Sequence, residues 1–239
     1  MIKTFKVLSA VLSYPSVDLQ AAVDDMKSAV REEALLAPEL IESLSAFLNE
    51  FSHTDLYELQ ERYVLLFDRT RSLSLHLFEH IHGESRERGQ AMVDLAEQYR
   101  QKGLVISNRE LPDYLPLFLE YLSTMEMPEA RDVLAQPLHI IAALGQRLQR
   151  RDSSYAVPFA ALEGLAALVP ESQAVQAILD ELEDNPEDFE QLDQIWQESE
   201  VVFGPGTGQD SGCPQDSPGL SSVRVAVPSQ TMKQASSKH

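Results

Sequence analysis

Cysteine is almost absent from this chain of 239 residues. The single cysteine, Cys213, has no partner within the chain, so neither an internal disulfide nor a cysteine-based metal or iron–sulfur site can form. This usage is typical of a reducing compartment and predicts the cytoplasm. No apolar run approaches the roughly 18 residues that indicate a membrane span, so membrane insertion is not expected.

Sequence motifs of the common catalytic and nucleotide-binding folds are also missing. The chain contains no Walker loop, no G-x-G-x-x-G and no G-x-S-x-G. Positive charge is scarce, because 38 acidic residues face only 19 Lys and Arg, and the net charge is −19. Such a charge repels phosphate backbones and attracts basic partners, so nucleic-acid binding is not predicted.

The scarcity of positive charge is greatest toward the C-terminus. No Lys or Arg lies between Asp152 and Phe203, and residues 180–200 carry ten acids. This run is by default a solvated helix face, and the alternative is a surface that steers a basic partner. Residues 204–239 contain five Gly, four Pro, seven Ser and no aromatic residue, which predicts a disordered tail after a helical domain of residues 1–203.

Amphipathic helical periodicity is present almost throughout residues 1–203. Apolar residues recur at helical spacing, and Ser, Asp and Pro stand where helices begin. With 44% hydrophobic residues, the chain can bury a sizeable core. We therefore predict an all-α, single-domain bundle of about nine to eleven helices. One helix is predicted to begin near Ile2 and another at Pro38. A single helix is predicted after Ser16 as far as Val30, and another from Thr54 or Asp55 as far as Phe67. Further helices are predicted over roughly 84–102, 128–136, 137–150, 154–168, 171–184 and 187–203.

Two further stretches have a less regular pattern. Leucines alternate over residues 73–77 as in a strand, but no second strand candidate exists, so residues 68–83 are predicted to be a partly helical loop. Downstream, Ser107 or Asn108 is expected to cap a helix with Leu111 on its inner face. Pro116 lies inside that pattern and predicts either a kink or a late helix start.

The residues His76, Glu79 and His80 form the pattern H-x-x-E-H. In inverted zinc proteases this spacing supplies two metal ligands and a base, so a zinc-dependent hydrolase is one alternative function. A third protein ligand is required, and His82 lies only two residues on, in a different helical direction. The other interpretation is that His80 and His82 fix a loop through hydrogen bonds.

A local basic cluster surrounds this pattern. Arg86 and Arg88, with the preceding Arg69 and Arg71, have the chemistry to hold the phosphate of a nucleotide-like cofactor. A guanine-nucleotide-binding regulator is therefore a second alternative function. In the interpretation that we favour, the arginines pair with neighbouring acids, namely Asp68, Glu84 and Glu87.

One long stretch carries a family resemblance. Residues 77–95, LFEHIHGESRERGQAMVDL, followed by ELPDY at 110–114 and LEY at 119–121, resemble the NarJ-type assembly chaperones of respiratory nitrate reductase. These chaperones belong to the wider TorD-like family of redox-enzyme maturation chaperones. The resemblance extends from the first helix to about Trp196 and does not cover the tail.

The wider family is marked by an acidic residue, a proline and an Asp-His pair. Glu110, Pro112 and Asp113 match this motif, whereas Tyr114 stands where histidine is usual. The resemblance therefore implies a functional role for Asp113. The role of the family's histidine has no matching histidine at position 114.

The resemblance implies a cytoplasmic, TorD-like helical chaperone without enzymatic activity. Such a chaperone binds the N-terminal segment of the apo catalytic (alpha) subunit of nitrate reductase, expected to be a basic amphipathic peptide. It enables insertion of the molybdenum bis-guanine-dinucleotide cofactor before membrane anchoring, holds no cofactor permanently and is absent from the finished enzyme. Proteins of molybdenum cofactor biosynthesis are further implied partners.

The candidate site residues follow from these stretches. No catalytic residue and no metal ligand is predicted under this interpretation, and Arg86 and Arg88 are the candidates for contacting a cofactor. The candidates for client binding are Tyr63, Glu79, His80, His82, Glu84, Arg86, Glu110, Pro112, Asp113, Tyr114 and Glu120.

Overall fold

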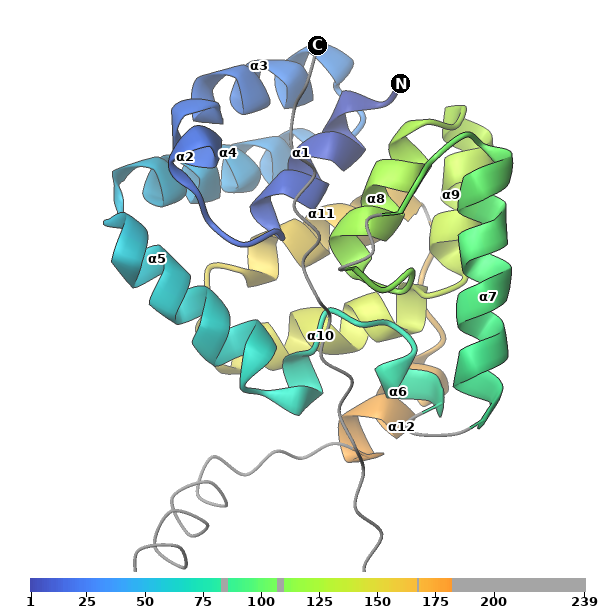
Figure 1. Cartoon of the computed structure of the whole chain (residues 1–239). Helices are drawn as coiled ribbons and strands as arrows, with labels where there is room; N and C mark the ends of the chain where they lie inside the picture. The colour runs from blue at the N-terminus through green and yellow to red at the C-terminus, as the bar shows by residue number, and fades with distance from the viewer. Residues whose placement is uncertain (83–85, 107–109, 167, 182–239) are drawn as a thin grey trace, which may run out of the picture. The chain divides into compact units, whose positions relative to one another are not determined.

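The computed structural model describes residues 1–82, 86–106, 110–166 and 168–181, except for the side chains of His82, Arg86 and Glu181. Within these ranges all regular elements are helical, and an isolated β-bridge joins His76 and Tyr114. The all-α prediction is confirmed. The elements (Figure 1) are α1 (Lys3–Val11), α2 (Val17–Ala21), α3 (Val23–Glu33), α4 (Pro38–His53), α5 (Leu56–Tyr63), the π-helix η1 (Val64–Asp68), the 3-10 helix η2 (Arg71–Leu73), α6 (Glu79–His82), α7 (Arg86–Gln101), α8 (Leu115–Ser123), α9 (Met127–Ala135), α10 (Leu138–Arg150), α11 (Ala156–Ala166) and α12 (Ser172–Glu181).

The helices pack around one cluster of buried apolar side chains. α1 packs mainly on α8 and also on α3, while α10 packs on both α11 and α12, and α4 packs on α11. α7 runs beside α8 and α9 (Figure 1), where its Tyr99 ring contacts Tyr121 and its end is tied to α9 by Lys102 and Glu129. The described ranges hold no helix that is long and apolar enough to cross a membrane.

The start of α1 is capped by a residue from another helix. Its first turn has no side-chain cap of its own. Instead, the Glu33 carboxylate at the end of α3 accepts hydrogen bonds from the Lys3 and Thr4 N–H groups at 2.6 and 2.7 Å. A carboxylate at a helix N-terminus satisfies free donors and complements the helix dipole. The contact therefore joins α1 to α3.

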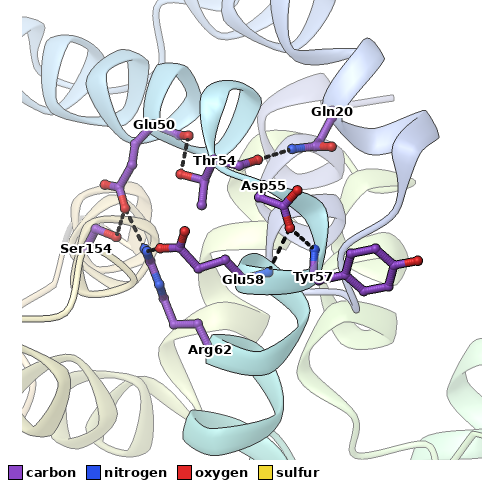
Figure 2. A network of polar contacts seen from close by, with 8 residues as sticks. All are labelled: Gln20, Glu50, Thr54, Asp55, Tyr57, Glu58, Arg62 and Ser154. Atoms are coloured by element: carbon purple, nitrogen blue, oxygen red, sulfur yellow. Dashed lines mark hydrogen bonds and ion pairs between the residues drawn. The ribbon is translucent and has the colours of Figure 1, made fainter.

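The position of α5 is set by a polar network (Figure 2). Asp55 accepts hydrogen bonds from the N–H groups of Tyr57 and Glu58 at 2.9 and 3.4 Å, which confirms the predicted cap. Arg62 pairs with Glu58 one turn earlier and with Glu50 of α4. These contacts hold α5 against the end of α4.

Two predicted helices are irregular. The helix predicted from Ser16 to Val30 is broken at Ala22, where ψ is 0°, and the break allows Val23 to be buried. This break and the short α6 give twelve α-helices in the described ranges, more than the predicted nine to eleven. The helix that follows Asp55 continues beyond Tyr63 as the π-helix η1. Such π-turns occur often at functional sites.

The structure settles the two irregular stretches of the sequence. Of the stretch predicted to be a partly helical loop, the described residues 69–82 contain η2, α6 and non-helical backbone, as predicted. The predicted start of the next helix, directly after residue 108, was wrong, because α8 begins only at Leu115. The alternative of a late helix start linked to Pro116 is confirmed. The N–H of Leu115 donates to Leu75, so the preceding backbone is held in non-helical pairing. Leu111 is consequently half exposed and not on an inner helix face.

Some predictions lie outside the described residues. These are the helix over 187–203, the tail over 204–239 and the capping roles of Ser107 and Asn108. The boundary between domain and tail therefore stays a prediction.

Candidate functional site

Two distant chain segments meet next to α6 and enclose a carboxylate. The N–H of Leu77 donates to the Asp113 carbonyl at 3.0 Å, and the N–H of Leu115 donates to the Leu75 carbonyl at 2.8 Å. The Asp113 side chain is fully buried and accepts a hydrogen bond from the Phe78 N–H at 3.2 Å. A buried carboxylate is costly unless donors surround it, so these contacts determine whether the site assembles.

His76 is the nearest side-chain partner of Asp113. Its Nδ1 lies 3.1 Å from Asp113 Oδ1, and about a third of the His76 side chain remains exposed. The hydrogen bond to Asp113 raises the pKa of His76 by more than burial lowers it, which favours the imidazolium. An Asp–His pair therefore exists in this chain although Tyr114 occupies the position where the family motif has histidine.

Arg88 joins α7 to this pair. Its Nη2 lies 3.1 Å from Glu79 Oε1 and 3.8 Å from Asp113 Oδ2. Burial raises the pKa of Glu79, but hydrogen bonds from Ser74 and Arg88 outweigh it and bring the pKa below its ordinary value. Glu79 and Arg88 thus form an ion pair next to the buried carboxylate.

Tyr114 connects the site to α1 and α5. Its hydroxyl lies 2.9 Å from the Tyr63 hydroxyl, which donates to the Leu12 carbonyl at 3.0 Å. A hydroxyl carries one proton, so Tyr114 donates to Tyr63. Burial raises the pKa of both tyrosines, and they stay protonated at neutral pH. The Tyr114 ring also lies 5.5 Å from the His76 ring, centroid to centroid.

The H-x-x-E-H side chains turn toward different partners. His80 is buried and donates from Nε2 to the Ser74 carbonyl at 2.8 Å, while His76 and Glu79 make the ion pairs described above. Burial lowers the pKa of His80, so its ring is neutral. The described residues include no group of three His, Cys, Asp or Glu side chains placed to hold a metal ion. This geometry gives the zinc-hydrolase alternative no support and matches a loop-fixing role for His80.

Three adjoining hollows around η1 share lining residues. Two of them, of about 320 and 400 Å³, share Tyr14, and we call them together the aromatic groove. The third, of about 410 Å³, is called the arginine pocket. The aromatic groove is lined by Tyr14, Tyr57, Gln60, Glu61, Tyr63, Val64, Leu65, Asp68, Arg69, His76, Glu110, Leu111 and Tyr114. The arginine pocket is lined by Phe67, Asp68, Arg69, Arg71, Ser74, His76, Glu79 and Arg88.

Exposed apolar side chains gather in the aromatic groove. Tyr14, Tyr57, Leu65 and Leu111 are 51, 79, 50 and 47% exposed, respectively. Single exposed apolar residues are ordinary, but several along two adjoining hollows indicate a surface that contacts another apolar surface. Three carboxylates line the same groove, those of Glu61, Asp68 and Glu110.

A cluster of rings supports the groove from inside. Tyr63 contacts Tyr14 edge-on, with ring centroids 5.6 Å apart, and Phe67 at 5.1 Å. Phe67 in turn meets Tyr155 edge-on at 5.1 Å, and Tyr155 meets Phe47 of α4 at 5.4 Å. Such packed rings give the groove a rigid floor.

The predicted client-binding residues are distributed unevenly. Glu120 lies exposed on α8 and lines neither the aromatic groove nor the arginine pocket. Glu84 and the side chains of His82 and Arg86 lie outside the described residues. Those that the structure brings together around Asp113 and the groove are Tyr63, Glu79, His80, Glu110, Pro112, Asp113 and Tyr114.

Sequence reasoning missed several groove residues. Tyr57 and Leu65 are exposed and lie outside the row of apolar residues that faces the core. Apolar residues outside such a row were the sequence signal that could have identified them. His76 was considered only as a zinc ligand, because its pairing with Asp113 spans 37 positions and no local pattern indicates it.

Comparison with known proteins identifies the family. The family model described as nitrate reductase delta subunit matches residues 30–161. The chain is 43% identical over 208 residues to the nitrate reductase molybdenum cofactor assembly chaperone NarJ of Escherichia coli K12, covering 87% of this chain and 86% of that protein. It is 37% identical over 198 residues to the probable chaperone NarW of the same strain, covering 83 and 82%, and 35% identical over 178 residues to the probable NarJ of Bacillus subtilis 168, covering 73 and 96%. The chain therefore belongs to the nitrate reductase delta subunit family and is a NarJ-type nitrate reductase molybdenum cofactor assembly chaperone.

Proposed function

We propose that this chaperone binds the N-terminal segment of the apo catalytic subunit of nitrate reductase in the aromatic groove. The observation that carries the proposal is that four exposed apolar side chains line the two adjoining hollows of the aromatic groove, namely Tyr14, Tyr57, Leu65 and Leu111. An amphipathic helix buries its apolar face in such a groove, and spaced apolar side chains act as its anchors.

Charge supports a basic client segment. The groove carries Glu61, Asp68 and Glu110 against Arg69, and the whole chain has a net charge of −19. This charge accelerates the encounter with a basic peptide and contributes less to the final affinity. Binding is therefore expected to weaken as the salt concentration rises.

The bound chaperone holds the catalytic subunit open for insertion of the molybdenum bis-guanine-dinucleotide cofactor. It acts in the cytoplasm, delays membrane anchoring until the metal centres are in place, and then leaves. It catalyses no reaction itself, and it meets proteins of molybdenum cofactor biosynthesis while the client is held.

The test is co-purification of the full chain with the apo catalytic subunit, with and without the N-terminal segment of that subunit. We expect capture only when the segment is present. Leu65→Ser and Leu111→Ser should each weaken binding of the segment at least tenfold, because each removes about 2 kcal/mol of apolar contact.

Val93→Ser is the matched control, because Val93 is exposed on α7 and lies outside the groove lining. Equal capture of the intact and the truncated subunit would contradict the proposal. So would a loss of binding in Val93→Ser as large as the loss in Leu65→Ser.

A further inference from the structure

We propose that the arginine pocket binds the phosphate or pyrophosphate group of a small ligand. The pocket lies next to the aromatic groove and shares Asp68, Arg69 and His76 with it, but the inference does not rest on client binding there. It rests on the charge of the pocket lining, on two guanidinium groups that have no partner among the described residues, and on the way their backbone is held.

The charge of the lining is opposite to that of the chain. Acidic residues outnumber Lys and Arg two to one overall, 38 to 19, yet three arginines face two carboxylates in this pocket. Ser74 and His76 add further donors to the same wall. In a strongly acidic protein, a cationic hollow of about 410 Å³ is a local exception that favours an anion.

The three arginines divide into one that is paired and two that are not. Arg88 is bound to Glu79 at 3.1 Å and lies 3.8 Å from Asp113. The guanidinium groups of Arg69 and Arg71 make no hydrogen bond or ion pair with any residue that the structure describes. A guanidinium binds phosphate through two parallel N–H donors, so each of these two arginines has the chemistry to bind a phosphate group.

The backbone that carries these arginines is held from inside the protein. Arg69 closes η1 through its N–H to the Val64 carbonyl at 2.9 Å, and the Arg71 carbonyl accepts from the Ser74 N–H at 3.1 Å. The buried Arg147 donates to the Ser72 carbonyl at 2.7 Å. The backbone of the two arginines, at the end of η1 and the start of η2, is therefore held, and mainly their side chains need to be ordered when an anion binds.

Asp68 opposes the anion and supplies a test with a gain of binding. Its carboxylate lines the same pocket and has no partner side chain in the described part of the chain. Neutralising it removes repulsion of a bound phosphate without removing a donor. Asp68→Asn should therefore tighten anion binding.

The experiment is calorimetry of the full chain with inorganic pyrophosphate at low and at physiological ionic strength. We expect binding that Arg71→Gln weakens about tenfold, since a charge-assisted contact is lost. Arg151→Gln, at an exposed arginine after α10 outside the pocket lining, should leave it unchanged, and Asp68→Asn should tighten it severalfold. Guanosine and adenosine diphosphates in parallel show whether a base adds to the phosphate contact.

Several outcomes would overturn the proposal. These are no binding of pyrophosphate, equal weakening by Arg71→Gln and Arg151→Gln, or tighter binding of a glutamate-rich peptide than of pyrophosphate. Arg71 lies outside the aromatic groove, so Arg71→Gln should still bind the client segment. A failure of anion binding is in this way distinguishable from a failure of client binding.

Discussion

At the scale of single residues, the buried carboxylate of Asp113 controls the site. It lies within contact distance of His76, Arg88 and the Phe78 N–H, which come from a loop and from α7. The imidazole that pairs with this carboxylate belongs to His76, which lies 37 positions earlier in the chain. Tyr114 at the motif position instead ties the site to Tyr63.

Asp113→Asn should lower the free energy of unfolding by about 2–4 kcal/mol, because buried donors lose a charged acceptor. Urea unfolding measures the change. Asp132→Asn, at an exposed residue of α9, is the control and should change the free energy by less than about 0.5 kcal/mol. A loss in Asp113→Asn no larger than in the control would show that the buried pair does not stabilise the fold.

His76 and His80 should have opposite effects on the way the free energy of unfolding changes with pH. The raised pKa of His76 means that its contribution is fully present below about pH 6.5 and is lost as the pH rises through the raised value. The lowered pKa of His80, whose Nδ1 has no hydrogen-bond partner among the described residues, means that its contribution is present above about pH 6.5 and is lost as the pH falls.

Urea midpoints at pH 5.5 and pH 8 test this sign. The cost of His76→Gln should be larger at pH 5.5, and the cost of His80→Gln should be larger at pH 8. Identical costs at both pH values would contradict the assignment of a charged His76 and a neutral His80.

At the scale of elements, helical periodicity predicted most of the fold. The caps at Ser16 and Asp55 are both present, because these signals are local. The start of α8 was not predictable in the same way, since residues 113–115 pair with residues 75–77. The exposed groove residues were not predicted for a related reason. Helical periodicity identifies the residues that face the core, but it does not show which exposed residues line a groove.

Two helical glycines should respond oppositely to alanine. A Cβ at Gly145 of α10 would lie 3.2 Å from the Phe159 Cβ of α11, where neither backbone can easily yield. A Cβ at Gly89 of α7 would meet no atom within 4 Å. Gly89→Ala should therefore stabilise by about 0.5–1 kcal/mol through helix propensity, whereas Gly145→Ala should destabilise by about 1–3 kcal/mol through overpacking.

Thermal unfolding of both variants checks this pair. The midpoint should rise for Gly89→Ala and fall for Gly145→Ala. A rise in both would mean that α10 and α11 separate readily at this contact.

At the scale of the whole molecule, the acidic charge and the family were accessible from sequence, whereas the groove was not. Its lining comes from the segment after α1, from α5, η1 and the residue that follows it, from the loop around His76 and from the segment before α8. No single stretch contains it, and only tertiary packing brings the hollow that Leu65 lines next to the hollow that Leu111 lines. The partition into an aromatic groove and an arginine pocket likewise emerges only in three dimensions.

Hydrogen exchange of the full chain, with and without the client N-terminal peptide, tests the central claim most directly. Binding in the aromatic groove predicts slower exchange in residues 57–69 and 110–114, with α9 and the C-terminal half of α10 unchanged. Protection confined to α9, α10 or α12, or no protection in residues 57–69 at saturating peptide, would contradict it.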